Sequence, residues 1–313
     1  MTTVAWDHDA RALRLIDQTR LPEIEVYVRC RTSAEVAAAI RAMVVRGAPA
    51  IGVAAAYGAA LAAAEERPEA GRALLRAARP TARDLFWAVE LVARAPTPEA
   101  ALGAAHRLAR ESIEACQAMG RHGAALLPDH GRIVTICNTG ALATVDYGTA
   151  LGVVRTAHEL GRNPFVFVLE TRPRAQGARL TTWELDRLAI PHKLIADGAA
   201  GLLLQRGMVD VALAGADRVC ANGDVVNKVG TYPLALLSRE HGVPFYAVAP
   251  TTTIDPDTAE GASVTIEERD PAEVTTFAPA GTAAWNPAFD VTPARLVTAL
   301  VTETGVHRPG EAR

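Results

Sequence analysis

The stretch VDVALAGADRVCANGDVVNKVGTY, residues 209–232, decides the fold. It opens with a short apolar run, Val209–Ala214, that is typical of a buried strand in a parallel sheet. Asp217 and Arg218 follow where this strand would leave the sheet, and a helical pattern starts near Gly230. Ligands of open α/β sheets bind beyond the carboxyl ends of the strands, and free N–H groups at a helix start attract anions. The stretch therefore predicts an acid, a cation and a phosphate site at one sheet edge; the alternative is that Asp217 and Arg218 only pair with each other.

Four further apolar runs alternate with helical patterns, at residues 133–136, 165–169, 193–196 and 245–249. Short strands that alternate with helices predict βαβ units and a parallel, doubly wound sheet. All five runs end in polar or reactive groups, which are Cys137-Asn138, Glu170-Thr171-Arg172, Asp197, Asp217-Arg218 and Pro250-Thr251. Because this topology collects the carboxyl ends of the strands on one edge, we expect these groups to share a cleft.

The N-terminal part of the chain predicts a different, mainly helical domain. Short strands are expected at residues 12–16 and 24–29, and a helix is expected to begin with Ser33 as its N-cap. Further helices are expected at residues 72–78, 84–95 and 98–127. We therefore expect an α/β chain of two domains, a mainly helical domain over residues 1–120 and a parallel-sheet domain over residues 121–313.

Composition excludes several classes of function. A net charge of −3 offers no basic field for nucleic acid and no polybasic patch for a membrane. The uncharged stretch 48–64 is short and weakly apolar for a bilayer span, so it predicts a buried helix. The four cysteines lie far apart without metal-ligand spacing, and no signal peptide opens the chain. We therefore expect a cytoplasmic protein with free thiols and no zinc site.

The reactive groups indicate a class of ligand. The sequence contains no glycine-rich dinucleotide motif, Walker motif, HExxH or GxSxG, which argues against dinucleotide oxidoreductases, P-loop enzymes, zinc proteases and serine hydrolases. The remaining candidates are a thiol, an acid, amides and cations: Cys137, Asp217, Asn138, Gln176, Asn227, Arg46, Arg79, Arg172 and Lys228. Cations suit a phosphate, amides suit sugar hydroxyls, and an acid and a thiol suit proton transfer. A small phosphosugar is therefore the expected ligand.

Two of these assignments have a structural alternative. Gly47 and Ala48 leave N–H groups free at a helix start beside the Arg46 guanidinium, which suits an anion, but the same residues also suit a tight corner between two helices. Lys228 is one of only two lysines in the chain and is expected in a polar loop after Asp217, where it could bind a phosphate. The alternative is a solvated ion pair with Asp224.

Six segments closely resemble the methylthioribose-1-phosphate isomerases. They are VRGAPAIGVAAAYG (45–58), RPTARDLFW (79–87), CNTGALATVDYGTALGV (137–153), ETRPRAQGARLTTWEL (170–185), GADRVCANGDVVNKVGTY (215–232) and WNPAFDVTPARLVTALVTE (285–303). The resemblance covers nearly the whole chain. It implies a helical N-terminal domain, a Rossmann-like C-terminal domain, a homodimer, and an enzyme that needs no metal ion and no nucleotide.

The resemblance also implies roles for individual residues. Cys137 matches the active-site cysteine of these isomerases and Asp217 matches their catalytic acid. The substrate-binding positions correspond to Arg46, Gly47, Ala48, Arg79, Gln176, Asn227 and Lys228. Three residues depart from the pattern of the family, namely Asp84, Gly198 and Cys220. They leave the catalytic pair intact and leave the fine specificity open.

The expected reaction converts 5-methylthioribose 1-phosphate to 5-methylthioribulose 1-phosphate in methionine salvage, with Asp217 opening the ring and Cys137 beside the reacting carbons. Hydrogen transfer as a proton or as a hydride is compatible with these residues. The alternatives are an isomerase of 5-deoxyribose 1-phosphate or ribose 1,5-bisphosphate, and a non-catalytic regulatory subunit that senses a phosphosugar or nucleotide. The presence of both catalytic residues favours an enzyme.

Overall fold

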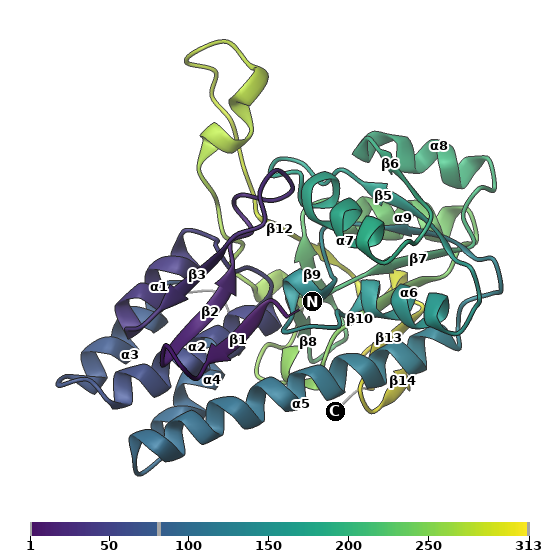
Figure 1. Cartoon of the computed structure of the whole chain (residues 1–313). Coiled ribbons are helices and arrows are strands. Elements are labelled where there is room, and N and C mark those ends of the chain that lie inside the picture. Colours follow the sequence, from purple (N-terminus) through teal and green to yellow (C-terminus); the bar gives the residue numbers. More distant parts are fainter. Residues whose placement is uncertain (1, 80–82, 312–313) are drawn as a thin grey trace. The chain divides into compact units, whose positions relative to one another are not determined.

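The computed structural model describes residues 2–79 and 83–311 (Figure 1). Residues 80–82, which belong to the motif that begins at Arg79 and to an expected break between two helices, lie outside the described residues. The chain divides into two compact units, Met1–Gln117 with Thr139–Gly152, and Ala118–Asn138 with Val153–Arg313. The segment 139–152 thus packs with the N-terminal residues, although it follows the first strand of the parallel sheet in sequence. Nothing in the sequence indicated this.

The first unit combines a small antiparallel sheet with helices. The sheet has the order β1 (Val4–Asp7), β2 (Ala12–Ile16), β3 (Tyr27–Cys30). The helices are α1 (Ser33–Arg41), α2 (Ala48–Ala63), α3 (Pro68–Arg76), α4 (Arg83–Ala93) and α5 (Pro98–Ala124), whose last turns belong to the second unit. Helix α2 is buried along most of its length, as the uncharged stretch predicted. In the described part of the chain, no helix is both long enough and apolar enough to cross a membrane.

The N-cap of α1 is Thr32, so the prediction of Ser33 was wrong. Thr32 has extended backbone angles and accepts the N–H of Glu35, whose carboxylate binds back to the Thr32 N–H, which completes a capping box. The Ser33 side chain instead donates to the carboxylate of Glu65 at 2.8 Å. Glu35, three residues after Thr32, was the signal in the sequence that distinguishes the two hydroxyl residues.

The second unit is built on a seven-stranded sheet of order β14-β13-β10-β7-β4-β5-β6. Its strands are β4 (Arg132–Thr135), β5 (Phe165–Leu169), β6 (His192–Ile195), β7 (Val211–Ala214), β10 (Phe245–Val248), β13 (Ala299–Thr302) and β14 (Gly305–His307). All pairs are parallel except β13 with β14. The six parallel strands follow the order 3-2-1-4-5-6 of a Rossmann-like doubly wound sheet, which confirms the predicted fold class.

Helices α6 (Ala150–Glu159), α7 (Thr182–Arg187), α8 (Ala200–Gln205) and α9 (Thr231–Glu240) alternate with these strands. A second, smaller sheet of order β11-β8-β9-β12 follows β7, with strands β8 (Arg218–Cys220), β9 (Val225–Lys228), β11 (Ile254–Asp255) and β12 (Phe289–Thr292). The sequence predicted a polar loop around Lys228, and this was wrong, because Val225–Lys228 form a buried strand.

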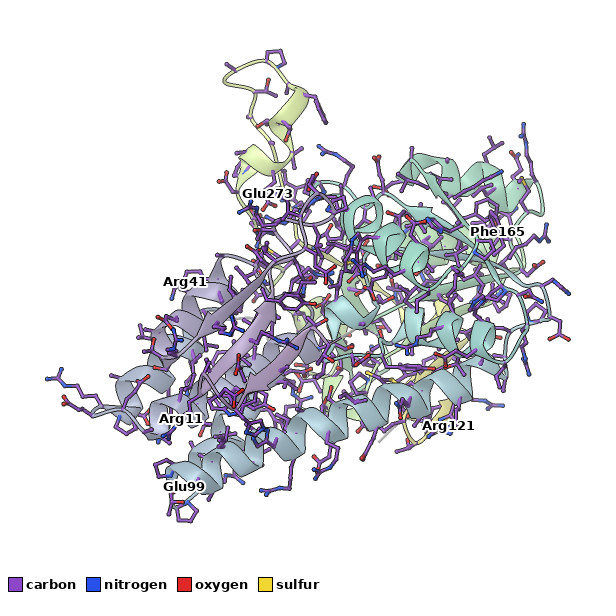
Figure 2. The ribbon with its side chains drawn as sticks, viewed as in Figure 1. Arg11, Arg41, Glu99, Arg121, Phe165 and Glu273 are labelled. Atoms are coloured by element: carbon purple, nitrogen blue, oxygen red, sulfur yellow. The ribbon has the colours of Figure 1, made fainter. Side chains whose placement is uncertain are left out.

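The segment 256–288, between β11 and β12, projects from the second unit and is yellow-green in Figure 1. Glu273, which Figure 2 labels, lies in this segment. It ties the segment to the loop after β5, because it pairs with Arg174 at 2.8 Å. Arg172 donates to the carbonyl oxygen of Val274 at 3.1 Å, and its guanidinium lies over the Phe277 ring. Arg172, one of the candidate phosphate-binding cations, therefore helps to fasten this segment.

The N-terminus of α9 is capped from another strand. Asp290 on β12 accepts the N–H of Gly230 at 2.7 Å and the N–H of Tyr232 at 3.1 Å. Burial raises the pKa of Asp290 to about 6, although these N–H groups and the Lys228 ammonium oppose the rise. The helix start that the sequence offered to a phosphate is thus already bound to a carboxyl group of the chain.

We expect the protonation of Asp290 to make the free energy of unfolding depend on pH. Its pKa is about 6 in the folded chain against an ordinary value of 3.8, so the folded state binds more protons between these values and this contribution to stability falls as the pH rises through them. Asp290→Asn removes this dependence. The free energy of unfolding of the wild type minus that of the variant, measured with urea at several pH values, should fall from about pH 4 to about pH 6. A difference that is flat or rises over this range would contradict the assignment.

Candidate active site

The site is organised by strands β4 and β7, which pair at the point where the order of the parallel sheet reverses. Cys137 comes two residues after the end of β4, and Asp217 comes three residues after the end of β7. Ligands of doubly wound sheets bind in the crevice at this switch point. The structure therefore brings the predicted thiol and the predicted acid to the carboxyl ends of two neighbouring strands.

Cys137 occupies a turn that few non-glycine residues adopt. Its φ is +65°, and its side chain is buried, with 8% exposed. The Cys137 N–H donates to Thr171 Oγ1 at 2.8 Å, and its carbonyl oxygen accepts the hydroxyl of Thr181 at 2.7 Å. Hydrogen bonds on both sides of the residue thus hold the conformation that aims the thiol.

Asp217 is fixed by a hairpin of strands β8 and β9. Its N–H donates to the carbonyl oxygen of Val226 at 2.9 Å. In this hairpin Arg218 also faces Val226, so two consecutive residues of the chain lie opposite the same residue of β9. Arg218 binds the carboxylate of Asp255 at 2.7 Å. The hairpin therefore fixes the backbone of the acid, while the neighbouring cation supports the small sheet.

Asn227 and Lys228 end strand β9 and are both buried, with 4% and 9% exposed. The Asn227 amide donates to Thr231 Oγ1 at 2.9 Å. The Lys228 ammonium donates to the carbonyl oxygen of Ala288 at 2.7 Å and lies 4.8 Å from the centre of the Phe289 ring. Burial and these contacts with Ala288 and Phe289 argue against the solvated ion pair with Asp224, whose carboxylate accepts from Asn222 and from backbone N–H groups.

Gln176 lies in the loop after β5, directly before the π-helical turn Gly177–Thr181. The loop packs so tightly that a Cβ atom on Gly177 would lie 1.7 Å from the carbonyl oxygen of Leu169. Gln176 is buried, and its Oε1 atom has no hydrogen-bond donor among the described residues. Buried acceptors are nearly always bound, so this oxygen is a candidate for contact with a ligand hydroxyl.

In the first unit, Arg46, Gly47 and Ala48 form the entry to α2. Gly47 is the N-cap, with φ +90°, and a Cβ atom there would lie 2.4 Å from the carbonyl oxygen of Ala143. The corner therefore packs against the turn Ala141–Ala143, so it has a packing role as well as free N–H groups. Arg46 is buried, and Arg79 is half-buried next to the undescribed residues.

Two residues near Cys137, Thr181 and Glu184, were not predicted as part of the site, whereas Thr171 and Asp197 are among the groups that were expected to share a cleft. Thr171 and Thr181 bind its backbone, and Glu184 accepts the side-chain amide of Asn138 at 2.7 Å. Asp197 accepts the N–H groups of Thr171 and Arg172, both at 2.7 Å. Both missed residues lie in the segment 170–185 that carried the resemblance, which was the available signal.

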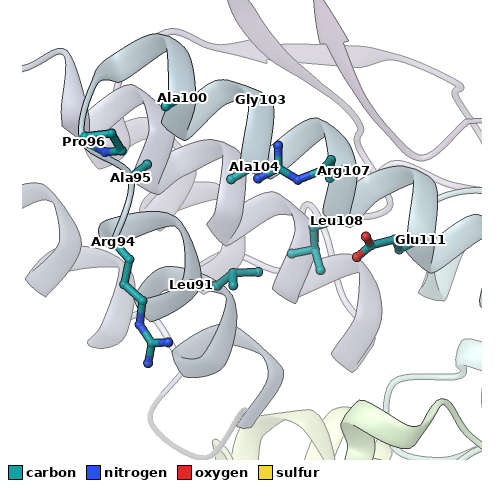
Figure 3. A pocket seen from close by; sticks show the side chains of 10 residues that line it. All are labelled: Leu91, Arg94, Ala95, Pro96, Ala100, Gly103, Ala104, Arg107, Leu108 and Glu111. Carbon is teal, nitrogen blue, oxygen red and sulfur yellow. The ribbon is translucent and has the colours of Figure 1, made fainter.

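Two cavities in the first unit contain none of the predicted site residues. The larger, of about 450 Å³, lies between α4 and α5 and is lined by residues such as Leu91, Arg94, Arg107, Leu108 and Glu111 (Figure 3). The smaller, of about 320 Å³, lies beside Trp6 and His8. The predicted thiol and the predicted acid lie instead after strands β4 and β7 of the second unit. Among the described residues, no three His, Cys, Asp or Glu side chains form a group that could hold a metal ion.

Comparison with known proteins gives consistent results. The sequence pattern of the initiation factor 2 subunit family matches residues 44–309. A methylthioribose-1-phosphate isomerase of Pelotomaculum thermopropionicum is 49% identical, over 99% of this chain and 92% of its own. The protein of that name from Desulforudis audaxviator is 52% identical, over 96% of this chain and 93% of its own.

Two solved structures share the fold over 99% of this chain, both at 42% sequence identity. The 5-methylthioribose 1-phosphate isomerase of Pyrococcus horikoshii superposes with a TM-score of 0.91 over 93% of its chain. A protein named translation initiation factor eIF-2B, subunit delta, from A. fulgidus superposes with a TM-score of 0.88 over 96% of its chain. The resemblance read from the motifs is thereby confirmed, and the chain belongs to the initiation factor 2 subunit family, as a relative of the proteins named methylthioribose-1-phosphate isomerase.

Proposed function

We propose that this protein is an aldose–ketose isomerase that converts 5-methylthioribose 1-phosphate to 5-methylthioribulose 1-phosphate, a step of methionine salvage, in the cytoplasm. The observation that carries the proposal is the position of Cys137 and Asp217 after the two strands that flank the switch point. The names of relatives at about half sequence identity support the choice of substrate.

The chemistry needs an acid first. Because phosphate on the anomeric oxygen keeps the ring closed, the ring oxygen must receive a proton as its bond to C1 breaks, and Asp217 supplies that proton. A hydrogen then moves from C2 to C1, and the C2 hydroxyl loses its proton as the ketone forms, so the reaction consumes nothing else. Cys137 lies beside the reacting carbons. Transfer through an enediolate and transfer as a hydride both satisfy this balance.

The remaining candidates bind the substrate. Cations and helix-start N–H groups contact the phosphate, and they are Arg46, Gly47, Ala48, Arg79 and Lys228. Gln176 and Asn227 contact the sugar hydroxyls. The buried Gln176 Oε1 atom, which lacks a donor among the described residues, supports this role, because a hydroxyl of the sugar would supply one.

We also propose that the protein acts as a homodimer. Strand β6 ends the large sheet, and Leu194 on it is 50% exposed. Leu202 on the nearby helix α8 is 48% exposed. A strand at the edge of a sheet with exposed apolar side chains suits association with a second copy.

One finding favours a second candidate function. The relative from A. fulgidus, at 42% identity, is named as a subunit of a translation initiation factor. A non-catalytic subunit could use the same residues to sense a phosphosugar or nucleotide. The presence of the acid and the thiol together favours the enzyme, since a sensor needs neither.

Replacement of the acid tests the proposal. The purified protein should form a ketose from 5-methylthioribose 1-phosphate, and Asp217→Asn should lower kcat by about a hundredfold or more while calorimetric affinity changes little, because the proton is needed only in the transition state. A variant with nearly normal rates would refute the role of Asp217. Failure of the wild type to convert any 5-substituted ribose 1-phosphate would favour the sensor.

The 5-substituent should decide among substrates. We place the pocket for the 5-substituent at the start of α2, near Ala48–Tyr57. The sequence there offers alanine, isoleucine, valine and tyrosine side chains and no cation beyond Arg46. A dianionic 5-phosphate would lose its hydration there without a partner, whereas a methylthio or methyl group would not. We expect kcat/KM for the methylthio and 5-deoxy substrates to exceed that for ribose 1,5-bisphosphate by about tenfold or more. A higher value for the bisphosphate would contradict the assignment of this pocket.

Lys228→Met separates the charge of the lysine from its packing. Methionine keeps an unbranched apolar stem beside Phe289 and removes the ammonium. A charge-assisted contact to phosphate is worth about 1.5–3 kcal/mol, so kcat/KM should fall about ten- to a hundredfold. Loss of the contact to Ala288 should lower the melting temperature as well. If stability falls while kcat/KM is unchanged, the lysine is structural.

A further inference from the structure

A buried carboxyl group lies beneath the Cys137 turn, and the proposed reaction does not use it. Glu184, in the first turn of α7, is only 3% exposed, and Asn138, the residue after Cys137, is only 1% exposed. The Asn138 amide donates to Glu184 Oε1 at 2.7 Å. Because a carboxyl group is costly to bury, a fold keeps one where its hydrogen bonds serve a purpose.

The chemistry of the groups determines which atom donates and which accepts in each hydrogen bond between Glu184 and Cys137. The Asn138 amide nitrogen can only donate, and it donates to Glu184 and, at 3.3 Å, to Thr181 Oγ1. Since the Thr181 oxygen accepts there, its own proton is free to point at the Cys137 carbonyl oxygen, 2.7 Å away. Glu184 thus orients the Asn138 amide, and the amide orients the Thr181 hydroxyl. The hydroxyl in turn donates to the carbonyl oxygen of Cys137.

This chain of contacts ends on a strained residue. At φ +65°, Cys137 occupies the left-handed region that side chains other than glycine rarely adopt. The direction of its Cα–Cβ bond, and therefore of its thiol, follows from this backbone conformation. A turn that lost the contact on its carbonyl side would relax and turn the thiol elsewhere.

We propose that Glu184 is a positioning residue for the Cys137 thiol, acting through Asn138 and Thr181. The inference rests on the proposed role of Cys137 in the isomerase reaction and adds to it the group that sets the direction of the thiol.

A second, independent anchor makes the effect of Glu184 testable. The Cys137 N–H is held by Thr171 Oγ1, and the backbone of Thr171 is held in turn by the carboxylate of Asp197. None of these contacts passes through Glu184. Loss of Glu184 should therefore release only one side of the turn, so the enzyme should stay folded with a misdirected thiol.

The test compares variants by two readouts, the kinetic constants and the rate at which iodoacetamide alkylates Cys137 in the native protein. Glu184→Leu and Thr181→Val remove the acceptor and the hydroxyl. Glu184→Gln keeps an oxygen that can accept from Asn138. Thr302→Val is the matched control, because the hydroxyl of this fully buried residue on β13 serves only Thr304, His307 and Gly305 among the described residues. The three other cysteines serve as internal references for alkylation.

We expect Glu184→Leu and Thr181→Val to lower kcat by about ten- to a hundredfold, with KM within about threefold, as a misplacement of about 1 Å in a reacting group can do. Alkylation of Cys137 should become several times faster relative to the other cysteines. Glu184→Gln should keep kcat within about threefold of the wild type, and Thr302→Val should lower the melting temperature without changing kcat.

Two results would overturn the inference. One is that Glu184→Leu and Thr181→Val lose stability as Thr302→Val does but keep kcat and the alkylation rate. The other is that Glu184→Gln loses as much activity as Glu184→Leu. If Glu184→Leu does not fold, the kcat values and alkylation rates of Thr181→Val and Glu184→Gln decide whether Glu184 positions the thiol. If the wild type isomerises no sugar phosphate, the proposed function fails, while the alkylation rates still decide whether Glu184 positions the thiol.

Discussion

The parallel pairing of β4 with β7, in which Thr135 lies beside Leu213, is the contact on which the candidate site depends. Parallel strands end on the same edge of a sheet, and at this pair the helices that follow diverge to opposite sides. A thiol and an acid that are far apart in sequence therefore come to one edge of the sheet. The other candidates of the second unit are close to these strands in the chain: Gln176 follows β5, which pairs with β4, and Asn227 and Lys228 lie on the hairpin that follows β7.

The second constraint is that polar groups buried near this edge are bound to fixed partners. Asp290 holds the first N–H groups of α9, Lys228 is held by the carbonyl of Ala288, and Glu184 holds the amide beside Cys137. Groups fixed in this way need little rearrangement when a charged ligand arrives, which is the condition for electrostatic catalysis in an enclosed site. The buried Gln176 oxygen differs, because no donor among the described residues meets it.

The sequence predicted the parts of this arrangement that depend on local pattern. Five apolar runs predicted strands of the large sheet, and the groups after them predicted the site, since a buried strand and its polar end are adjacent in the chain. It did not predict that residues 139–152 pack with the first unit, or that Lys228 lies on a buried strand. Those outcomes depend on distant partners, such as Ala143 against Gly47 and β12 against β9. The network of Thr181 and Glu184 with Cys137 was missed for the same reason.

The central claim is that Cys137 and Asp217 act on the same bound sugar. A crystal structure of the protein with 5-methylthioribulose 1-phosphate would test it most directly. We expect the Asp217 carboxyl group within hydrogen-bond reach, about 2.6–3.2 Å, of the oxygen that closes the ring, and the Cys137 sulfur in contact with C1 or C2. A product bound away from the carboxyl ends of β4 and β7, with either residue out of reach of these atoms, would contradict it.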